Sequence, residues 1–274
     1  MSVAIVGSTV RDVVYLPGRE PTHSPGGSPI FAARALAALG VRPGVATRCD
    51  DEALAAPIAG LADPFCLRID ATVMQSELRY REDGERDHTL ASIGVAWSAE
   101  DIATWAAPAL EGATWIHAGT QRGGDLGPEV LAALADGGRC VALDVQGPLR
   151  LPQVGPLVLT GTLDDALLRH VQALKLSEEE ALAAFATTDA AAIREHCGVP
   201  EILVTFGFRG AAIASAGGSG HVSADAVTDI DPTGAGDAFL ASYTYARAEG
   251  AAALEAGRLA CEHVSALFAA RRGA

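Results

Sequence analysis

Lysine is almost absent from this sequence: Lys175 is the only one in 274 residues, and the formal net charge is −14. The arginines are scattered rather than clustered. Proteins that bind nucleic acids use clustered lysines and arginines to neutralise the phosphates, so this composition argues against a nucleic-acid partner. A phosphate ligand would have to be held by backbone N–H groups, a metal ion and a few arginines.

Long apolar runs are also absent. No uncharged apolar stretch reaches the roughly 18 residues that a membrane span requires, and the first residues, MSVAIVGST, lack the basic and apolar segments of a secretory signal. We therefore predict no membrane partner and a cytoplasmic location.

Cysteines are few, and their spacing includes no Cys-x-x-Cys pair. The sequence has five of them, an odd number: Cys49, Cys66, Cys140, Cys197 and Cys261. Neither a disulfide framework nor a zinc site is indicated. We expect these cysteines to be small core residues.

What is present is an apolar, regularly alternating chain. Hydrophobic residues make up 49% of it, and no linker-like segment divides it, which predicts a single domain over residues 1–274. Short β-type runs alternate with Ala/Leu-rich helical stretches, a pattern typical of a mostly parallel sheet with helices on both faces. The predicted strands are Val3–Val6, Thr114–His117, Val141–Val145, Leu157–Leu159, Leu174–Leu176 and Ile202–Thr205. The predicted helices are Ile30–Leu39, Pro128–Leu134, Leu163–Arg169, Ser177–Phe185 and the region Ala235–Ala270.

One region departs from this alternation. Residues 65–93 contain alternating polar and apolar positions and a turn at Asp83–Gly84, which predicts a β-hairpin. The hairpin would be either a projecting lid or an edge hairpin of the main sheet, and the pattern does not distinguish the two.

The segment Asp231–Phe239, DPTGAGDAF, carries the strongest chemical signal. Gly234 and Gly236, on either side of Ala235, allow a tight turn into a helix whose first N–H groups could hold an anion. Asp237 would lie in that first turn, where it could take a proton from a hydroxyl group. Taken alone, the segment would better fit a plain turn in which Asp237 only caps the helix.

Three further segments lie where such sheets place their sites, although each also fits an ordinary turn or cap. Gly26 and Gly27 precede a predicted helix, and Asp12 follows the first strand, where a carboxylate can accept hydrogen bonds from sugar hydroxyls. Thr205, Gly207 and Gly210 follow a later strand and would let a nucleotide approach the main chain. Neither a P-loop nor a Gly-x-Gly-x-x-Gly turn after the first strand is present.

Ser177 and Glu180 have the spacing of a helix capping box. The same Glu180 carboxylate could instead reach the water shell of a Mg²⁺ ion.

The order of these pieces resembles the ribokinase-like (PfkB) carbohydrate kinases over nearly the whole chain. GG at Gly26, KLSEEE from Lys175, TFGFRG from Thr205 and DPTGAGDAF from Asp231 carry the resemblance, and the last is the most specific. It implies a three-layer α/β/α fold with a central, mostly parallel sheet and a small β-hairpin lid. It also implies ATP as phosphoryl donor and Mg²⁺ as a required ion.

The resemblance also assigns roles to residues. Asp237 would be the base, with the N–H groups of Gly234, Ala235, Gly236 and Asp237 as the anion hole. Glu180 matches a glutamate that organises Mg²⁺ through water, and Asp231 matches an acid near a monovalent cation such as K⁺. Asp12, Gly26 and Gly27 match positions that contact the substrate; Thr205, Gly207, Gly210 and Gly236 match the nucleotide side.

Two departures and one further likeness bear on the acceptor. Phe31 stands where many sugar-specific members have an asparagine, so a polar contact is replaced by an apolar wall. Ser177 replaces an asparagine at the start of the magnesium motif. The segment Asp144–Arg150, with Gln146 and Arg150 as candidate substrate contacts, resembles a D-x-Q-G-x-x-R run of a myo-inositol-kinase-like subgroup.

These observations predict an ATP-dependent kinase that phosphorylates a hydroxyl of a sugar, polyol or cyclitol. Two alternatives stay open: a nucleoside kinase in which Phe31 or Phe65 stacks on a base, and a non-catalytic relative that senses a nucleotide or metabolite. The resemblance also permits a homodimer formed through the lids.

Overall fold

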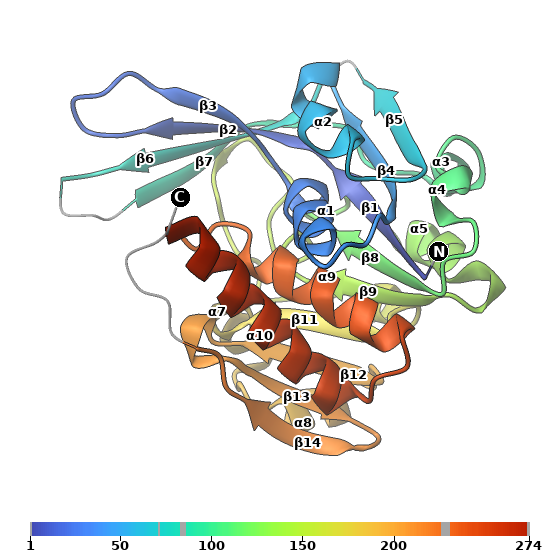
Figure 1. Ribbon diagram of the computed structural model, residues 1–274. Helices are drawn as coiled ribbons and strands as arrows, with labels where there is room; N and C mark the ends of the chain where they lie inside the picture. Colours follow the sequence, from blue (N-terminus) through green and yellow to red (C-terminus); the bar gives the residue numbers. More distant parts are fainter. Residues whose placement is uncertain (1, 71, 83–85, 226–230, 273–274) are drawn as a thin grey trace.

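The computed structural model describes residues 2–70, 72–82, 86–225 and 231–272, and it contains two β-sheets (Figure 1). The main sheet has nine strands in the order β14-β13-β12-β11-β9-β8-β1-β4-β5. Its strands are β1 (Val3–Ser8), β4 (Gly44–Cys49), β5 (Phe65–Ile69), β8 (Trp115–Gly119), β9 (Cys140–Asp144), β11 (Ala173–Ser177), β12 (Glu201–Thr205), β13 (Ala211–Ser215) and β14 (Gly218–Val222). Neighbouring strands are parallel except at β13 and β14, which continue the sheet as antiparallel strands.

Helices cover both faces of the main sheet, as the alternating pattern predicts. Along β1, Val3 and Ile5 join one core with α1 (Ser28–Ala38), α2 (Glu52–Ala59), α9 (Ala235–Ala248) and α10 (Ala253–Arg272). Ala4 and Val6 join the opposite core with α3 (Ala99–Ala103), α4 (Ala107–Leu110), α5 (Pro128–Ala135), α6 (Asp165–Leu168), α7 (Glu178–Phe185) and α8 (Ala190–Cys197). The result is the predicted three-layer α/β/α arrangement.

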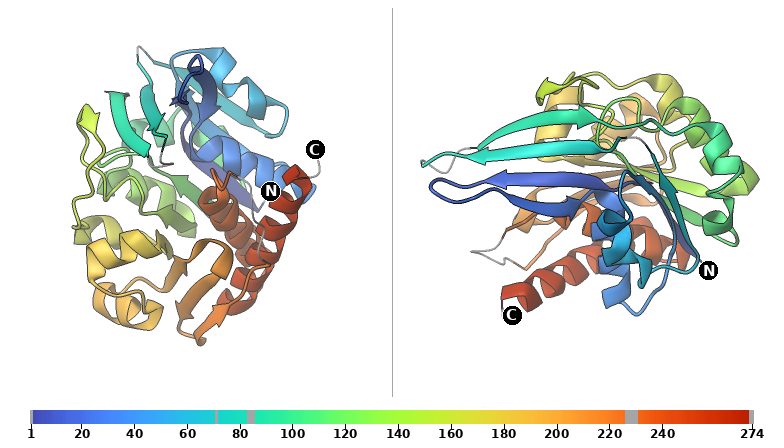
Figure 2. Two further views of the ribbon diagram at one scale, coloured as in Figure 1. Left: turned by 90° about the vertical axis from the view of Figure 1, so that its left-hand side faces the viewer. Right: turned by 90° about the horizontal axis from the view of Figure 1, so that it is seen from above.

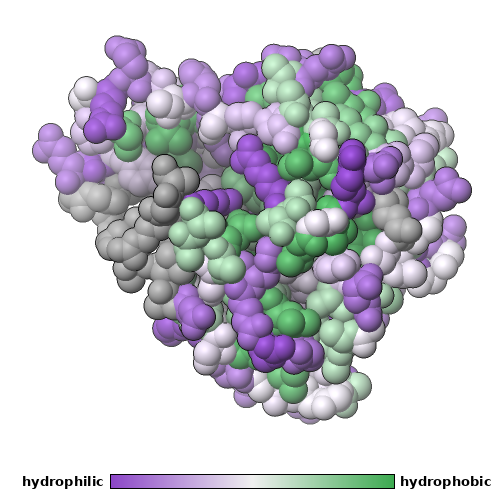
Figure 3. Space-filling model, in the orientation of Figure 1, coloured by the Kyte–Doolittle hydropathy of each residue, from purple (hydrophilic) through white to green (hydrophobic). Residues whose placement is uncertain are grey.

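The second sheet has five strands in the order β10-β7-β6-β2-β3. Its strands are β2 (Val10–Tyr15), β3 (Thr22–Gly26), β6 (Met74–Tyr80), β7 (Arg86–Ile93) and β10 (Gly155–Pro156). β2, β3, β6 and β7 project from the body of the molecule in Figure 1 and in the right-hand view of Figure 2, and we call this sheet the lid. Hydrophilic residues cover the far ends of its strands (Figure 3), where Arg19, Glu20, Arg81 and Glu82 are exposed.

The predicted hairpin is confirmed as β6 and β7, but two details of that prediction are wrong. Phe65–Ile69 belongs to the edge of the main sheet, where β5 pairs in parallel with β4. The lid is also more than a hairpin, since β2 pairs with β6 and brings the segment Val10–Gly26 into the sheet. The turn predicted at Asp83–Gly84 lies outside the described residues. The prediction of a single domain stays a prediction.

Two further expectations differ from the structure. Leu157–Leu159 is not a strand of the main sheet; Leu159 forms only an isolated bridge with Arg150. This part of the chain crosses from the main sheet to the lid, where β10 pairs with β7. The long C-terminal helical region is divided into α9 and α10, because the chain turns at Gly250 with φ at 94°.

None of the helices within the described residues combines the length and the apolar character needed to span a bilayer.

Candidate active site

The predicted site residues converge where the carboxyl ends of the central strands meet the helix N-termini and the base of the lid. β9 ends at Asp144, β11 at Ser177 and β12 at Thr205, while α9 begins at Ala235. Parallel strands carry their ligands at this edge because helix N-termini and loop side chains gather there.

The first turn of α9 has two N–H groups to offer an anion. Gly234, with φ at 82°, is the N-cap, and the Ala235 N–H donates to the Pro232 carbonyl at 3.0 Å. Within the described part of the chain, the N–H groups of Gly236 and Asp237 have no carbonyl partner. These two groups therefore remain as donors at the positive end of the helix.

Close packing holds this turn in place. A Cβ on Gly234 would lie 2.2 Å from the Phe31 ring, so the ring rests directly against the turn. Gly27, the N-cap of α1, has φ at 97° and approaches the Ser8 carbonyl so closely that a Cβ there would lie 2.5 Å from its oxygen. Phe31, predicted as an apolar wall for the substrate, thus also supports the anion-binding turn.

Four buried polar residues surround the predicted base Asp237: Ser28, His117, Asp144 and Lys175. We call these four residues and Asp237 the base cluster. The Lys175 ammonium donates to the Asp144 carboxylate at 2.8 Å, and the side chains of both are almost fully buried. A Cβ on Gly236 would lie 2.8 Å from Lys175 Nζ, so the ammonium packs under the first turn of α9. Asp237 itself is half-buried, as a group that must reach a substrate should be.

Electrostatics at Asp237 favour proton uptake near neutral pH. Desolvation and the neighbouring Asp144 carboxylate raise the pKa of Asp237 to about 6, against the opposing effects of Ser28, Lys175 and Arg150. Lys175 stays charged despite its burial, because the carboxylates of Asp144 and Glu180 raise its pKa. A carboxylate with its pKa just below neutral suits a general base.

A second carboxylate faces the site from the lid. Burial raises the pKa of Asp12 to about 6, while the Arg150 charge lowers it. A Cβ on Gly26 would lie 1.9 Å from Asp12 Oδ2, so only glycine lets that carboxylate pack against β3. In the amide orientation that its neighbours favour, Gln146 accepts hydrogen bonds from Arg150 at 2.6 and 2.9 Å. The structure thus brings Asp12, Gly26, Gln146 and Arg150 together.

The lid adds polar groups that the sequence pattern did not indicate. Ser24 and Ser76 are the register partners of Asp12 on either side, so all three side chains share one face of the sheet. The Ser76 hydroxyl and His88 Nε2 form a hydrogen bond of 2.6 Å. A row of small polar groups therefore faces the same way as Asp12.

The predicted nucleotide side is an apolar slot beside the anion-binding turn. Thr205, Gly207 and Gly210 line it, as does Gly236. Its other walls come from Phe208, Ala224, Pro232, Ala235, Phe239, Cys261, Val264 and Ser265. Gly210 has φ at 96°, and a Cβ there would lie 2.0 Å from the Val222 carbonyl oxygen, so the turn after β12 requires glycine.

The two predicted metal residues lie close to the site in different settings. Glu180 caps α7: its carboxylate accepts from the Ser177 N–H at 2.7 Å, and its own N–H donates to the Ser177 hydroxyl at 3.2 Å. Asp231 is exposed and accepts from the Thr233 N–H at 3.0 Å. Within the ranges that the structure describes, no group of three or more His, Cys, Asp or Glu side chains could hold a metal ion by itself.

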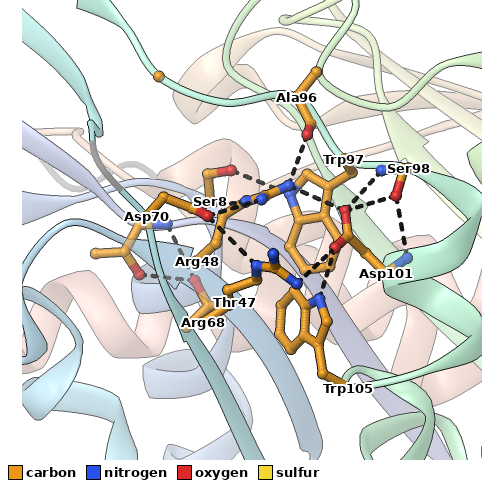
Figure 4. Close-up of polar contacts among 12 residues, drawn as sticks. Ser8, Thr47, Arg48, Arg68, Asp70, Ala96, Trp97, Ser98, Asp101 and Trp105 are labelled. Atoms are coloured by element: carbon orange, nitrogen blue, oxygen red, sulfur yellow. Dashed lines mark hydrogen bonds and ion pairs between the residues drawn. The ribbon is translucent and has the colours of Figure 1, made fainter.

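A second polar group, which we call the arginine cluster, is shown in Figure 4. It consists of Arg48, Arg68, Asp70 and Asp101. Its Arg48 is buried, whereas the side chain of Arg68 is half-exposed. Arg48 donates to Asp70 at 3.0 Å, to Asp101 at 3.2 Å and to the Ala96 carbonyl at 2.7 Å. This cluster fastens the segment after β7 to the end of β4.

Sequence reasoning missed the base cluster apart from Asp237. One signal was available: the only lysine in the chain lies within a predicted buried strand, and Asp144 ends another. A buried ammonium requires a buried partner, which could have linked the two. Nothing in the sequence singles out Ser28 or His117.

Comparisons with known proteins agree with this site. A family model described as pfkB family carbohydrate kinase matches residues 147–274. A Zea mays protein named inositol 3-kinase is 34% identical over 140 residues, which are 50% of this chain and 35% of the maize protein. The match thus spans about a third of that relative's length.

Solved structures show the same fold over nearly the whole chain. A pyrophosphate-dependent kinase in the ribokinase family, complexed with a pyrophosphate analog and myo-inositol, is 21% identical, with a TM-score of 0.81 over 97% of this chain and 95% of that one. An Arabidopsis thaliana ribokinase, complexed with ribose and ATP, is 20% identical, with a TM-score of 0.73 over 98% and 92% of the two chains. Residues 147–274 thus resemble the pfkB family of carbohydrate kinases, and nearly the whole chain has the ribokinase-like fold.

Proposed function

We propose that this chain transfers a phosphoryl group from ATP to a hydroxyl of a polyol or cyclitol, with Asp237 as the general base. The observation that carries the proposal is the half-buried Asp237 carboxylate at the start of α9, beside the N–H groups of Gly236 and Asp237, which no carbonyl of the described residues accepts from. A base and a preorganised anion site in one helical turn are what phosphoryl transfer to a hydroxyl requires.

In the proposed reaction, Asp237 accepts the proton of the acceptor hydroxyl, and the oxygen of that hydroxyl forms a bond to the terminal phosphorus of ATP. The bond between that phosphorus and the bridging oxygen breaks, and ADP leaves. The N–H groups of Gly236 and Asp237 stabilise the negative charge on the transferring group. Arg150, whose charge acts on both Asp12 and Asp237, lies close enough to assist.

A hydroxyl-rich acceptor is supported by the polar face of the lid. Asp12, Ser24 and Ser76 line one side of that sheet, and polar groups arranged in this way favour a ligand that can pair with all of them. The similarity to the maize inositol 3-kinase and to a structure holding myo-inositol makes a cyclitol the first acceptor to test.

ATP is proposed as the donor because of the slot beside the anion-binding turn. Phe208, Phe239 and Val264 give it an apolar wall, which suits a planar base. Pyrophosphate has no apolar part to place there. It is the second candidate, because a relative of the same fold is pyrophosphate-dependent.

Magnesium fits this site only as an ion shared with the donor phosphates. The described residues hold no cage of three acidic or imidazole ligands, and Glu180 is one of the carboxylates near Lys175. Mg²⁺ typically keeps several waters and binds through one or two carboxylates and the substrate phosphates. When bound, it would neutralise charge that develops on those phosphates. The monovalent cation near Asp231 and the homodimer stay predictions.

The deciding experiment measures phosphorylated product with ATP or pyrophosphate, Mg²⁺ and a panel of inositols, polyols, pentoses, hexoses and nucleosides. We expect turnover of a cyclitol or polyol with ATP, and its loss in Asp237→Asn. A nucleoside as the preferred acceptor would overturn the acceptor class. No product with any acceptor, together with retained ATP binding, would instead favour the sensor alternative.

The donor is tested separately by Val264→Trp, which fills the slot. If ATP is the donor, we expect its KM to rise about tenfold or more, because a bulky ring excludes the base. Thermal unfolding controls for folding. A rate that is higher with pyrophosphate and unchanged by this substitution would make pyrophosphate the donor.

A further inference from the structure

We propose that Ser28 and His117 are positioning residues, which hold the Asp237 carboxylate in its reactive orientation through a directed chain of hydrogen bonds. This inference deepens the proposed function, because it rests on Asp237 being the base.

The three side chains come from three elements and meet under the site. His117 lies in β8 and is 0% exposed; Ser28 opens α1 and is 1% exposed. Ser28 Oγ and His117 Nε2 are 2.7 Å apart, and the Ser28 side chain lies near enough to the carboxylate of Asp237 in α9 to lower its pKa. A hydrogen bond from Ser28 to Asp237 would therefore link the base to β8 of the main sheet.

The number of protons available fixes the direction of these hydrogen bonds. An ionised carboxylate can only accept hydrogen bonds, and a serine hydroxyl has one proton to donate. If Ser28 donates to Asp237, then His117 Nε2 must carry a proton and donate to Ser28 Oγ. The same tautomer leaves Nδ1 of His117 as an acceptor, and no described residue partners that atom, which avoids an unpaired buried N–H.

Neutral His117 is what this arrangement needs. Burial lowers the pKa of His117 to about 4, against the opposing effect of Asp144, so the ring carries one proton at neutral pH. The neutral ring can then donate through Nε2 without adding a second buried cation beside Lys175.

Gly119, at the end of β8, leaves the space that the Ser28 side chain occupies. A Cβ there would lie 2.2 Å from Ser28 Cβ and 2.3 Å from Ser28 Oγ. Any other residue at position 119 would displace the hydroxyl that joins His117 to Asp237.

Ser28 acts on Asp237 together with charges on every neighbouring element. Asp144, at the end of β9, raises the pKa of Asp237; Lys175 from β11 and Arg150 from the loop after β9 lower it, as Ser28 does. A hydrogen bond to the charged form of a carboxylate favours that form. Removing the Ser28 hydroxyl should therefore raise the pKa of Asp237 and loosen its orientation.

The first test uses Ser28→Ala and reads the pKa of Asp237 directly, by NMR titration of protein with ¹³C-labelled aspartate. The resonance is assigned by its loss in Asp237→Asn. We expect the pKa to rise by about one unit, the effect of one hydrogen bond to a charged group. The matched control is Ser242→Ala, a buried hydroxyl of the same helix that donates to the Ala238 carbonyl, which should leave the pKa in place.

The second test compares two substitutions of His117 in the pH dependence of kcat/KM. His117→Met removes the donor and should move the acid limb to higher pH; His117→Gln keeps an amide N–H donor and should restore most of the original profile. An Asp237 pKa that Ser28→Ala leaves unchanged would overturn the inference. A raised pKa in a protein that phosphorylates no acceptor would sustain the inference and overturn the proposed function instead.

Discussion

The base cluster and the arginine cluster are both groups of polar and charged side chains at the carboxyl edge of the main sheet, yet they are built differently. In the arginine cluster, Asp101 accepts hydrogen bonds from Ser98 and Trp105 as well as Arg48 (Figure 4). These contacts overcome the effect of burial and lower the pKa of Asp101. In the base cluster, the effects of burial and of Asp144 are larger than the opposing effects of Ser28, Lys175 and Arg150. The pKa of Asp237 therefore rises to about 6.

This difference separates a structural from a chemical use of buried charge. A carboxylate surrounded by donors is stabilised in its charged form and contributes to folding. A carboxylate left with few donors beside another carboxylate is destabilised in its charged form and becomes a better proton acceptor. Two groups of similar composition therefore predict opposite responses to substitution.

The largest expected effect belongs to the base itself. Asp237→Asn removes the proton acceptor but keeps the shape of the side chain, so we expect turnover to fall about a hundredfold or more, the usual scale for a positioned base. Donor binding, measured by calorimetry, should change little. An unchanged turnover would remove Asp237 from the mechanism and abolish the contrast between the two clusters.

The next effect should fall on stability and only at the arginine cluster. Arg48→Met leaves Asp70 and Asp101 with only the half-exposed Arg68 as a shared cation, which should lower the free energy of unfolding by about 3 kcal/mol. Denaturant unfolding measures this change. Arg11→Met, which removes the partly exposed pair with Asp50, is the control and should lower it by less than about 1 kcal/mol. Equal losses would mean that the arginine cluster carries no special share of the stability.

A third prediction uses charges of opposite sign in the base cluster. Lys175→Met removes a cation and should move the acid limb of kcat/KM to higher pH; Asp144→Asn removes an anion and should move it to lower pH, each by about one pH unit. The double variant should return toward the original profile, since no unpaired buried charge remains. Arg48→Lys, in the other cluster, should not move the limb. Shifts of Lys175→Met and Asp144→Asn in the same direction would contradict an electrostatic role.

The smallest expected effect is a gain in stability. Because the pKa of Asp237 is raised by folding, the folded state binds that proton more tightly than the unfolded chain does. The stabilisation that comes with this proton is complete below the unfolded pKa near 3.8 and is lost as pH rises through about 6. Asp237→Asn should therefore raise Tm by a few degrees at pH 8, and the gain should disappear toward pH 4. A variant with a lower Tm at pH 8 would show that Asp237 is part of a stabilising pair, as Asp101 is.

Much of the fold could be predicted because it depends on local patterns. The apolar strand runs and helical repeats predicted the layers of the main sheet. DPTGAGDAF predicted the turn into α9 and the position of Asp237 in its first turn. The capping box at Ser177 and Glu180 formed as its spacing predicts.

The lid was only half predicted, since its pairing is long-range. Residues 74–93 alternate as a hairpin should, whereas β2 and β3 look like a loop and a glycine turn along the chain. They form strands because β2 pairs with β6 and β3 pairs with β2. For the same reason, Leu157–Leu159 has a strand-like sequence without a place in the main sheet.

By itself, the sequence determined that one helix would begin at a glycine-rich turn with an acid in its first turn, since backbone freedom and capping are local properties. Only the tertiary structure decided what surrounds that acid. Ser28, His117, Asp144 and Lys175 come from α1, β8, β9 and β11, and no spacing along the chain connects them. The pKa of a buried carboxylate depends on its neighbours in space, because desolvation and Coulomb interactions act over a few ångströms irrespective of chain order.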